Sequence, residues 1–138
     1  MKKSMTIIAY VCIGLFALSL LYISILAWVD PKAVMAFVGV ALPNNDALSS
    51  IRGVYGGVGI FLVAVSVIVS IRNVQNGLLF FTAFWWMYAI SRILTIGMDG
   101  SLGEFGSTWL KIELTFGLLA FVLYLLQRYV LKKKDFTS

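Results

Sequence analysis

The sequence predicts an all-α integral membrane protein folded as a four-helix bundle, and three observations support this fold class. Hydrophobic residues make up 61% of the 138 residues and charged residues only 12%, whereas soluble domains average about 45–50% apolar and about 25% charged residues. The apolar residues fall into four runs, each long enough to cross a hydrocarbon core of roughly 30 Å. Most of the 11 Lys and Arg residues lie near the ends of these runs. We therefore expect one transmembrane domain over residues 1–138.

The first expected span covers residues 6–28, which carry no charged side chain. It is too long to be the hydrophobic part of a signal peptide, which covers about 7–15 residues, so we expect the span to be retained. Pro31, which follows Asp30, ends this helix because proline has no backbone N–H to donate. The apolar residues 33–42 are too few to cross a bilayer, and we expect an interfacial or re-entrant segment there.

Three further spans are separated by polar connections. They are expected over residues 47–71, 77–97 and 108–131. Asp46 is the expected N-cap of the second span, since its carboxylate can accept from free amide groups. The turn at residues 72–76 is short, so the second and third spans should be antiparallel neighbours. The longer connection at residues 98–107 contains several glycines and is expected to be a flexible loop.

The distribution of basic residues predicts that both chain ends face the cytoplasm, because Lys and Arg are enriched on that side of a membrane. The expected localisation is the cytoplasmic membrane, which the chain would cross several times. The cytoplasmic basic residues would then be Lys2, Lys3, Arg72, Arg128, Lys132, Lys133 and Lys134. The outer side would carry Lys32 and Lys111 together with Asp30, Asp46, Asp99 and Glu104.

Several kinds of chemistry are excluded by residue counts. The chain has no histidine, which is the commonest metal ligand and a frequent general base. Cys12 is the only cysteine, so neither an intrachain disulfide nor a thiolate metal cluster can form. We find no catalytic constellation and no motif for a metal, a cofactor or a nucleic acid. We therefore expect a protein that is not an enzyme.

Three charged residues, Arg52, Arg92 and Glu113, interrupt the apolar runs. A charge within a membrane span costs roughly 2.5–3.5 kcal/mol on insertion scales, so it usually has a partner or a task. The expected topology places all three in the outer third of the bilayer. The simplest arrangement is a buried cluster in which Glu113 accepts from one or both guanidinium groups.

Neighbouring residues are expected to complete this cluster. Trp85, Tyr88 and Arg92 share one helix face, and the guanidinium can lie over an aromatic ring. Tyr55 and Asp99 are the other candidate residues. Three interpretations stay open: an ionic staple that sets helix packing, separate snorkelling to the interface, and a ligand or ion site. The surplus of arginine over carboxylate favours an anionic third partner, such as a lipid phosphate.

Glycines indicate where helices approach each other closely. Gly53 and Gly57 form a GxxxG pair, with Gly56 and Gly59 beside them, and such a pair lets two helix backbones touch. The contact could lie within one chain, which we favour, or between two copies. Gly117 lies one helical turn after Glu113, where it would let another helix approach beneath the carboxylate.

The same residues resemble an uncharacterised bacterial membrane family, domain of unknown function 4345. The resemblance rests on Arg52-x-x-Tyr55-Gly56-Gly57, on Ser91-Arg92-Ile93-Leu94 leading to Asp99-Gly100, and on Glu113-Leu114 followed by Gly117-Leu118-Leu119-Ala120. It covers nearly the whole chain. The resemblance implies four helices and a recurring set of Arg, Arg, Asp and Glu, but it implies no activity.

The sequence therefore favours a non-catalytic membrane protein, either an accessory or interaction subunit or a binder of lipid or a small molecule. Membrane lipid is the expected partner, and another membrane protein or a second copy of the chain is a further possibility. The alternative is a small proton- or ion-coupled transporter that uses Glu113 as its embedded carboxylate.

Overall fold

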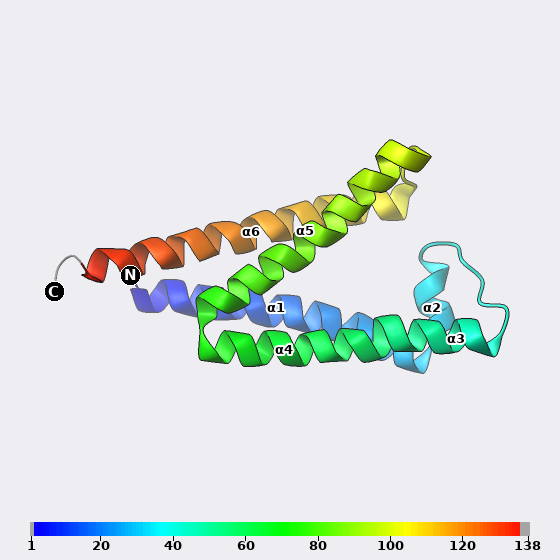
Figure 1. Ribbon diagram of the computed structural model, residues 1–138, viewed down its shortest axis with the longest axis horizontal. Helices are drawn as coiled ribbons and strands as arrows, with labels where there is room; N and C mark the ends of the chain where they lie inside the picture. Colours follow the sequence, from blue (N-terminus) through cyan, green and yellow to red (C-terminus); the bar gives the residue numbers. More distant parts are fainter. Residues whose placement is uncertain (1, 136–138) are drawn as a thin grey trace. The chain divides into compact units, whose positions relative to one another are not determined.

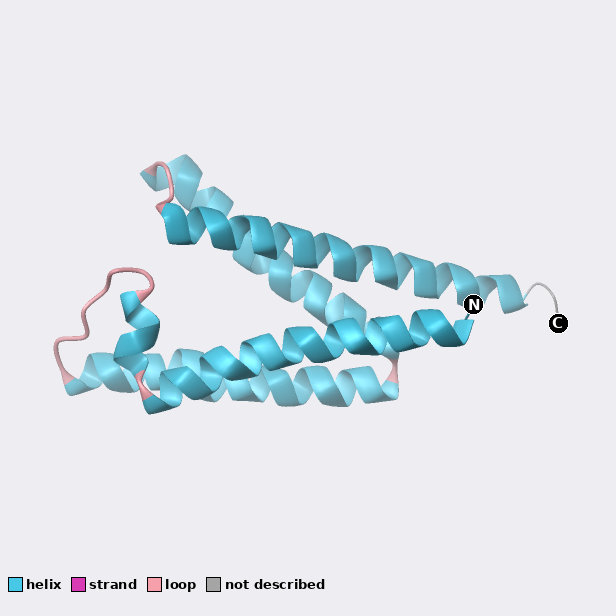
Figure 2. Cartoon of the chain, turned by 180° about the vertical axis from the view of Figure 1, so that it is seen from behind, coloured by secondary structure: helices cyan, strands magenta, loops and turns pink. Residues whose placement is uncertain are grey.

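The computed structural model describes residues 2–135, with side chains for residues 3–129. Every regular element in this part of the chain is a helix (Figure 2). The elements are α1 (Lys2–Val29), α2 (Pro31–Ala36), α3 (Asn45–Ile51), the π-helical segment η1 (Arg52–Gly57), α4 (Val58–Arg72), α5 (Val74–Asp99) and α6 (Glu104–Asp135). The side chains of the predicted basic tail, Lys132 to Lys134, lie outside those described.

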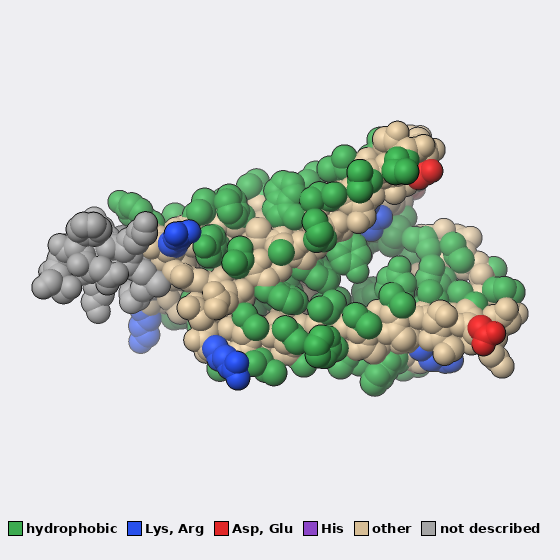
Figure 3. Space-filling model, in the orientation of Figure 1, with side chains coloured by type: hydrophobic (Ala, Val, Ile, Leu, Met, Phe, Trp, Pro, Cys, Tyr) green, Lys and Arg blue, Asp and Glu red, His purple; other side chains and the backbone are tan. Residues whose placement is uncertain are grey.

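Four helical stretches are long and apolar enough to cross a membrane, which confirms the all-α fold class and a multi-pass membrane protein. They are Lys3–Val29, Asn45–Arg72, Val74–Asp99 and Glu104–Tyr129. The first three predicted spans lie inside the first three of these stretches, and the fourth, 108–131, lies inside α6, which continues to Asp135. Many large apolar side chains are exposed, and hydrophobic side chains cover most of the surface in view (Figure 3). This is the surface expected of helices that face lipid rather than water.

The connections between the helices are shorter than the sequence predicts. Asn73 alone separates α4 from α5, and its side-chain oxygen accepts from the backbone N–H of Gln75 at 2.8 Å, so most of the predicted turn at residues 72–76 is helical. Gly100 ends α5 with a φ of 103°, a conformation that glycine adopts without strain. Only residues 100–103 of the expected loop at 98–107 are irregular.

Besides α5, two further helices, α2 and α3, begin with a side-chain cap. The Asp30 carboxylate accepts from the N–H of Ala33 at 3.1 Å and starts α2, in which Pro31 is the first residue. The prediction for the next helix is wrong, because the residue that caps α3 is Asn44, whose side-chain oxygen accepts from the N–H of Ala47 at 2.9 Å. The helix begins two residues earlier than expected, so Asp46 lies in its first turn, where a negative charge favours the helix dipole.

The short apolar stretch at residues 33–42 is only partly helical. Its first residues complete α2, and residues 37–44 are irregular. Gly39 allows the chain to turn there with a φ of 69°. No helix long enough to cross a membrane forms in this stretch, and its position at the interface or within the bilayer stays a prediction.

The chain divides into two compact units. Unit 1 contains residues 1–14 and 69–138, and unit 2 contains residues 15–68. Unit 1 thus holds the first half of α1, the last turn of α4, α5 and α6, and unit 2 holds the second half of α1 together with α2, α3, η1 and most of α4. The single domain over residues 1–138 stays a prediction.

In unit 2, α1 packs antiparallel against η1 and the start of α4. A Cβ at Gly56 would collide with the indole of Trp28, and a Cβ at Gly59 would collide with the hydroxyl of Ser24. Gly53, in contrast, has open space around its Cβ position. The close approach is therefore internal, but the predicted Gly53 and Gly57 pair does not make it.

The π-helical segment explains this shift in the packing face. A π-helix repeats its hydrogen bonds from i to i+5 and turns through a smaller angle per residue than an α-helix does, so it rotates the residues after it relative to those before it. The GxxxG spacing applies to an α-helix, whereas Gly53 and Gly57 both lie in η1. The faces before and after η1 are consequently offset, and the glycines that meet α1 are three residues apart.

In unit 1, α5 packs against α6 and crosses it at an angle (Figure 1). The buried residues of α5 recur with the three- and four-residue spacing of a helix face: Gly77, Leu78, Phe81, Thr82, Trp85 and Ala89. The buried residues of α6 recur in the same way: Glu113, Gly117, Ala120, Leu123 and Gln127. Gly117 lies against the indole of Trp86, 3.1 Å from the position a Cβ would occupy. A larger residue at this point would press on the Trp86 indole, so the glycine favours the close contact of the two helices.

Candidate functional site

The short connection between α5 and α6 brings two of the unusual charges to the same depth. Arg92 lies seven residues before the last residue of α5, and Glu113 lies nine residues after the first residue of α6. At 1.5 Å of rise per residue these positions are about 10 and 13 Å from the respective helix ends. Because the helices are antiparallel neighbours, the two side chains face each other across the seam between them.

Arg92 and Glu113 form an ion pair in this seam. The Arg92 Nε donates to Glu113 Oε1 at 2.9 Å and to Glu113 Oε2 at 2.8 Å. The Glu113 side chain is 2% exposed and the Arg92 side chain 22% exposed. The carboxylate is thus enclosed, whereas the guanidinium lies at the edge of the contact.

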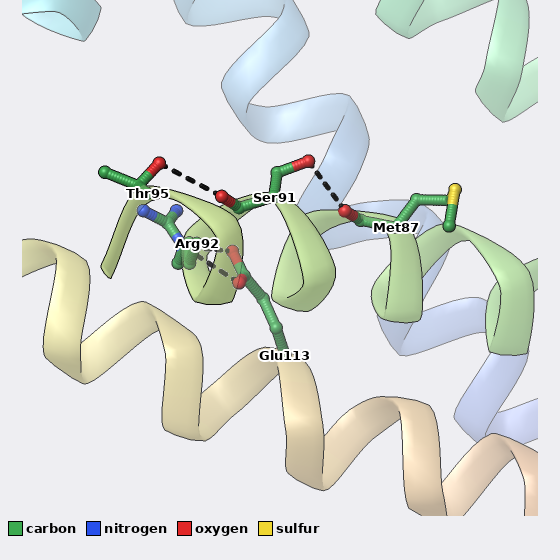
Figure 4. Close-up of polar contacts among 5 residues, drawn as sticks. All are labelled: Met87, Ser91, Arg92, Thr95 and Glu113. Atoms are coloured by element: carbon green, nitrogen blue, oxygen red, sulfur yellow. Dashed lines mark hydrogen bonds and ion pairs between the residues drawn. The ribbon is translucent and has the colours of Figure 1, made fainter. Parts of the chain in front are cut away.

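The orientation of the guanidinium leaves most of its donors unused. Both carboxylate oxygens share the single Nε–H, and the two terminal nitrogens point away from Glu113, toward the side on which Thr95 lies (Figure 4). Arginine has five N–H donors in a planar fork, so four of them have no acceptor among the described residues. This differs from the two parallel bonds of a fork-to-fork arginine–carboxylate pair.

Hydroxyl groups of α5 lie beside the pair. Ser91 Oγ donates to the Met87 carbonyl at 2.8 Å, and Thr95 Oγ1 donates to the Ser91 carbonyl at 3.0 Å (Figure 4). Both hydroxyl hydrogens are therefore used within the helix, but each oxygen can still accept. The sequence analysis did not single out Thr95, although its spacing of three residues from Arg92 places both on one helix face.

Aromatic rings close the seam further along both helices. Trp85 lies with its ring centroid 5.2 Å from that of Phe116 and 5.2 Å from that of Phe84, both nearly perpendicular to it. Phe84 also contacts Tyr88, with ring centroids 5.1 Å apart. Trp85 is buried and Tyr88 is exposed. The stacking of Arg92 over an aromatic ring stays a prediction.

Arg52 has a different partner in unit 2. Its Nε donates to the backbone carbonyl of Trp28 at 3.0 Å, and its side chain is exposed. Trp28 is in the last turn of α1, where helix carbonyls have no partner within the helix. The structure therefore brings together Arg92 and Glu113 as a pair. The predicted cluster of three charges would join two units and stays a prediction.

The other candidate residues lie at helix ends or on surfaces. Asp99 is the exposed last residue of α5, and Tyr55 is an exposed residue of η1. A polar contact that the sequence analysis missed is at the far end of unit 1, where the Nε2 of Gln127 donates to Thr6 Oγ1 at 3.4 Å. Gln127 is only 3% exposed, and the signal that could have found it is a lone amide within an apolar run.

Acidic side chains and Cys12 are spread over the described residues. No group of three or more His, Cys, Asp or Glu side chains lies close enough together there to hold an ion. What the α5–α6 seam offers instead is one half-buried guanidinium with open donors, held by one buried carboxylate.

The fold and this ion pair together define a multi-pass α-helical membrane protein with a charged site inside the seam between its last two spans. The chain belongs to the family described as Domain of unknown function (DUF4345), whose model matches residues 8–124. This confirms the family resemblance, and the matched region includes both residues of the ion pair. Neither the curated proteins nor the solved structures contain a match to the chain.

Proposed function

We propose that this protein is a non-catalytic membrane protein that binds a lipid or a small molecule at the Arg92–Glu113 pair. The observation that carries the proposal is the use of a single Arg92 donor by both oxygens of Glu113. The site would bind through the remaining N–H groups, with Glu113 holding the guanidinium in place.

The geometry of the Arg92–Glu113 pair supports a binding role more than a purely structural ion pair. A structural ion pair is most stabilising when the arginine and the carboxylate form two parallel hydrogen bonds. The Arg92–Glu113 pair leaves four N–H donors of Arg92 without an acceptor among the described residues. Polar groups without partners cost several kcal/mol in hydrocarbon, by the estimates for membrane proteins of roughly 2–7 kcal/mol per group. An acceptor from a lipid or a small molecule would remove this cost, and the 22% exposure of the Arg92 side chain gives it access.

The charges at the helix ends support a defined orientation. Four consecutive spans would place the start of α1, the end of α4 and the end of α6 on one side of the membrane. The exposed basic residues Lys3, Arg72 and Arg128 lie there, which favours the cytoplasmic side. We propose that both termini are cytoplasmic, that the protein resides in a bacterial inner membrane, and that the ion pair lies in the outer leaflet.

Co-purification tests the binding proposal. The protein and its Arg92→Gln variant would be extracted in the same mild detergent, and the molecules retained by each would be identified by mass spectrometry. We expect a lipid or a small molecule that the native protein retains and the Arg92→Gln variant loses. The exposed Arg128→Gln variant is the matched control and should retain it. If all three proteins retain the same molecules in the same amounts, the site does not bind them.

The transporter alternative predicts a different result. Glu113 would have to release Arg92 in each cycle, so substrate or proton flux in proteoliposomes would stop in Glu113→Gln. A flux that depends on Glu113 would replace the binding role with a transport role. The accessory-subunit role would instead be indicated by a partner protein that is retained by the native chain and by Arg92→Gln alike.

A further inference from the structure

We infer that the ligand of the Arg92–Glu113 pair is a zwitterionic phospholipid, with its phosphate on the terminal nitrogens of Arg92 and its cationic group near Asp99 and Glu104. This inference rests on the proposed binding function and goes further, because it names the class of ligand. It follows from the direction of the open donors, from the balance of charge around them, and from their depth in the span.

The direction of the donors favours a group that enters from the end of α5. The terminal nitrogens of Arg92 lie on the Thr95 side of the pair (Figure 4), and Thr95 is between Arg92 and the end of the helix at Asp99. The planar fork of arginine matches the geometry of a phosphate group with two parallel N–H donors. A phosphate held there would lie toward the membrane interface, where phospholipid headgroups are found.

The balance of charge argues against an anionic ligand. Glu113 already neutralises Arg92, so the pair has no net charge to attract an anion. Residues 74–113, which comprise α5, the connection and the first turns of α6, carry two basic side chains against three acidic ones. The basic residues are Arg92 and Lys111, and the acidic residues are Asp99, Glu104 and Glu113. A lipid with a net negative charge would therefore enter a region whose charge is already negative.

A zwitterionic headgroup resolves this conflict. Its phosphate supplies the acceptor that the Arg92 donors lack, and its ammonium or choline group adds a positive charge beyond the phosphate. Asp99 and Glu104, at the end of α5 and the start of α6, are both exposed carboxylates on the interface side of the pair. Opposite charges arranged in this order give electrostatic complementarity along the ligand.

The depth of the pair also favours a lipid over a free ion. Arg92 is about 10 Å below the end of α5, and the surrounding helix surfaces are apolar, with Ile93 and Leu94 exposed beside it. A lipid can place its acyl chains on this apolar surface while its phosphate meets Arg92, and the arginine can reach part of the way toward the interface. Inorganic phosphate would gain none of this apolar contact.

The test compares four probes on the full chain in a neutral detergent. Phosphatidylethanolamine, phosphatidylcholine and phosphatidylglycerol, all with the same acyl chains, and inorganic phosphate would be titrated while binding is followed by native mass spectrometry. We expect the two zwitterionic lipids to bind at least about tenfold more tightly than phosphatidylglycerol, which is the effect of one charge-assisted contact. Equal or tighter binding of phosphatidylglycerol, or displacement of lipid by inorganic phosphate, would overturn the inference.

Two sets of variants separate this inference from the proposed function. Arg92→Gln should weaken zwitterionic lipid binding by about tenfold, while Arg128→Gln leaves it unchanged. Lipid binding that does not depend on Arg92 would contradict both the inference and the proposed function. Binding that depends on Arg92 but is tighter for phosphatidylglycerol would contradict only the inference. Circular dichroism and elution volume would confirm that each variant is folded.

The surface carboxylates provide a second variant that does not touch the buried pair. The double substitution Asp99→Asn and Glu104→Gln should abolish the preference for zwitterionic over anionic lipid, because it removes the charges that favour the ammonium group. Asp46→Asn, an exposed carboxylate in the first turn of α3, is the matched control and should keep the preference. An unchanged preference in the double variant would overturn the assignment of the cationic group to these residues.

Discussion

Arg92 and Arg52 use the same atom for different purposes. In unit 1, Arg92 Nε donates to a carboxylate that is 2% exposed. In unit 2, Arg52 Nε donates to a backbone carbonyl in the last turn of α1, and the side chain is exposed. Removal of Arg92 would leave a buried charge without a partner, whereas removal of Arg52 would leave only an uncharged backbone carbonyl at the end of a helix. The burial of its partner therefore decides how much an arginine in an apolar run contributes to the free energy of unfolding.

The largest effect is expected for Arg92→Ala. The substitution leaves the Glu113 carboxylate buried and without its counter-charge, and breaking a buried pair in this way costs about 3–5 kcal/mol. We expect the free energy of unfolding in detergent to fall by about that amount, measured by chemical denaturation and circular dichroism. The exposed Arg128→Ala variant is the control. A loss no larger than that of Arg52→Gln would mean that the burial of Glu113 does not make Arg92 more important for stability than Arg52.

A smaller loss is expected for Gly56→Ala in unit 2. The new methyl group would collide with the indole of Trp28, and extra volume in a close contact costs about 1–3 kcal/mol. The matched control is Gly53→Ala, which has open space around its Cβ and should be neutral or slightly stabilising. Thermal unfolding of the two variants in the same detergent measures the difference. The reverse order of stability would mean that Gly53, rather than Gly56, meets α1.

Arg52→Gln is expected to have a modest effect. The hydrogen bond to the Trp28 carbonyl is exposed, and a typical hydrogen bond contributes about 0.5–1.5 kcal/mol of net stability. We expect a loss at or below about 1 kcal/mol, measured beside Arg92→Ala under the same conditions. A loss as large as that of Arg92→Ala would indicate that Arg52 has a buried acidic partner, as the three-charge cluster requires.

The smallest effect on stability is expected when both partners of the buried pair are replaced. The double substitution Arg92→Leu and Glu113→Leu leaves no buried charge behind, and replacing a buried ion pair with apolar residues is often neutral or stabilising by about 1–4 kcal/mol. We therefore expect a free energy of unfolding close to that of the native protein, together with complete loss of lipid selectivity. A stability as low as that of Arg92→Ala would mean that the pair itself, and not the stranded charge, holds the seam together.

The sequence alone predicted the helices and one of the two arginine contacts. Apolar run length determines where a helix can cross a membrane, so the four spans could be located within a few residues. Glu113 needs a cation because no water reaches a buried carboxylate, and Arg92 was at the right depth on an adjacent span. These inferences worked because they depend on composition and length, which a single sequence contains.

The remaining features depend on information that the residue pattern does not contain. Arg52 donates to a backbone carbonyl. Because every residue has a backbone carbonyl, the sequence does not indicate which of them Arg52 meets. Gly56 and Gly59, which meet α1, were among the expected packing glycines, but the GxxxG spacing pointed to Gly53 and Gly57, because it applies to an α-helix and both residues lie in the π-helical segment. Asn44 and Asp46 are both good N-cap residues, and only the backbone decides which of them starts α3.

The π-helical turn at residues 52–57 also has a consequence for insertions and deletions. A π-turn accommodates one more residue than an α-helical turn does, so the helix can lose one residue there and return to α-helical geometry. Arg52 and Gly59 could then keep the faces they present to α1. Elsewhere in the spans, a change of one residue would rotate everything that follows by about 100°. Members of this family that differ in length within the second span should therefore differ at this turn.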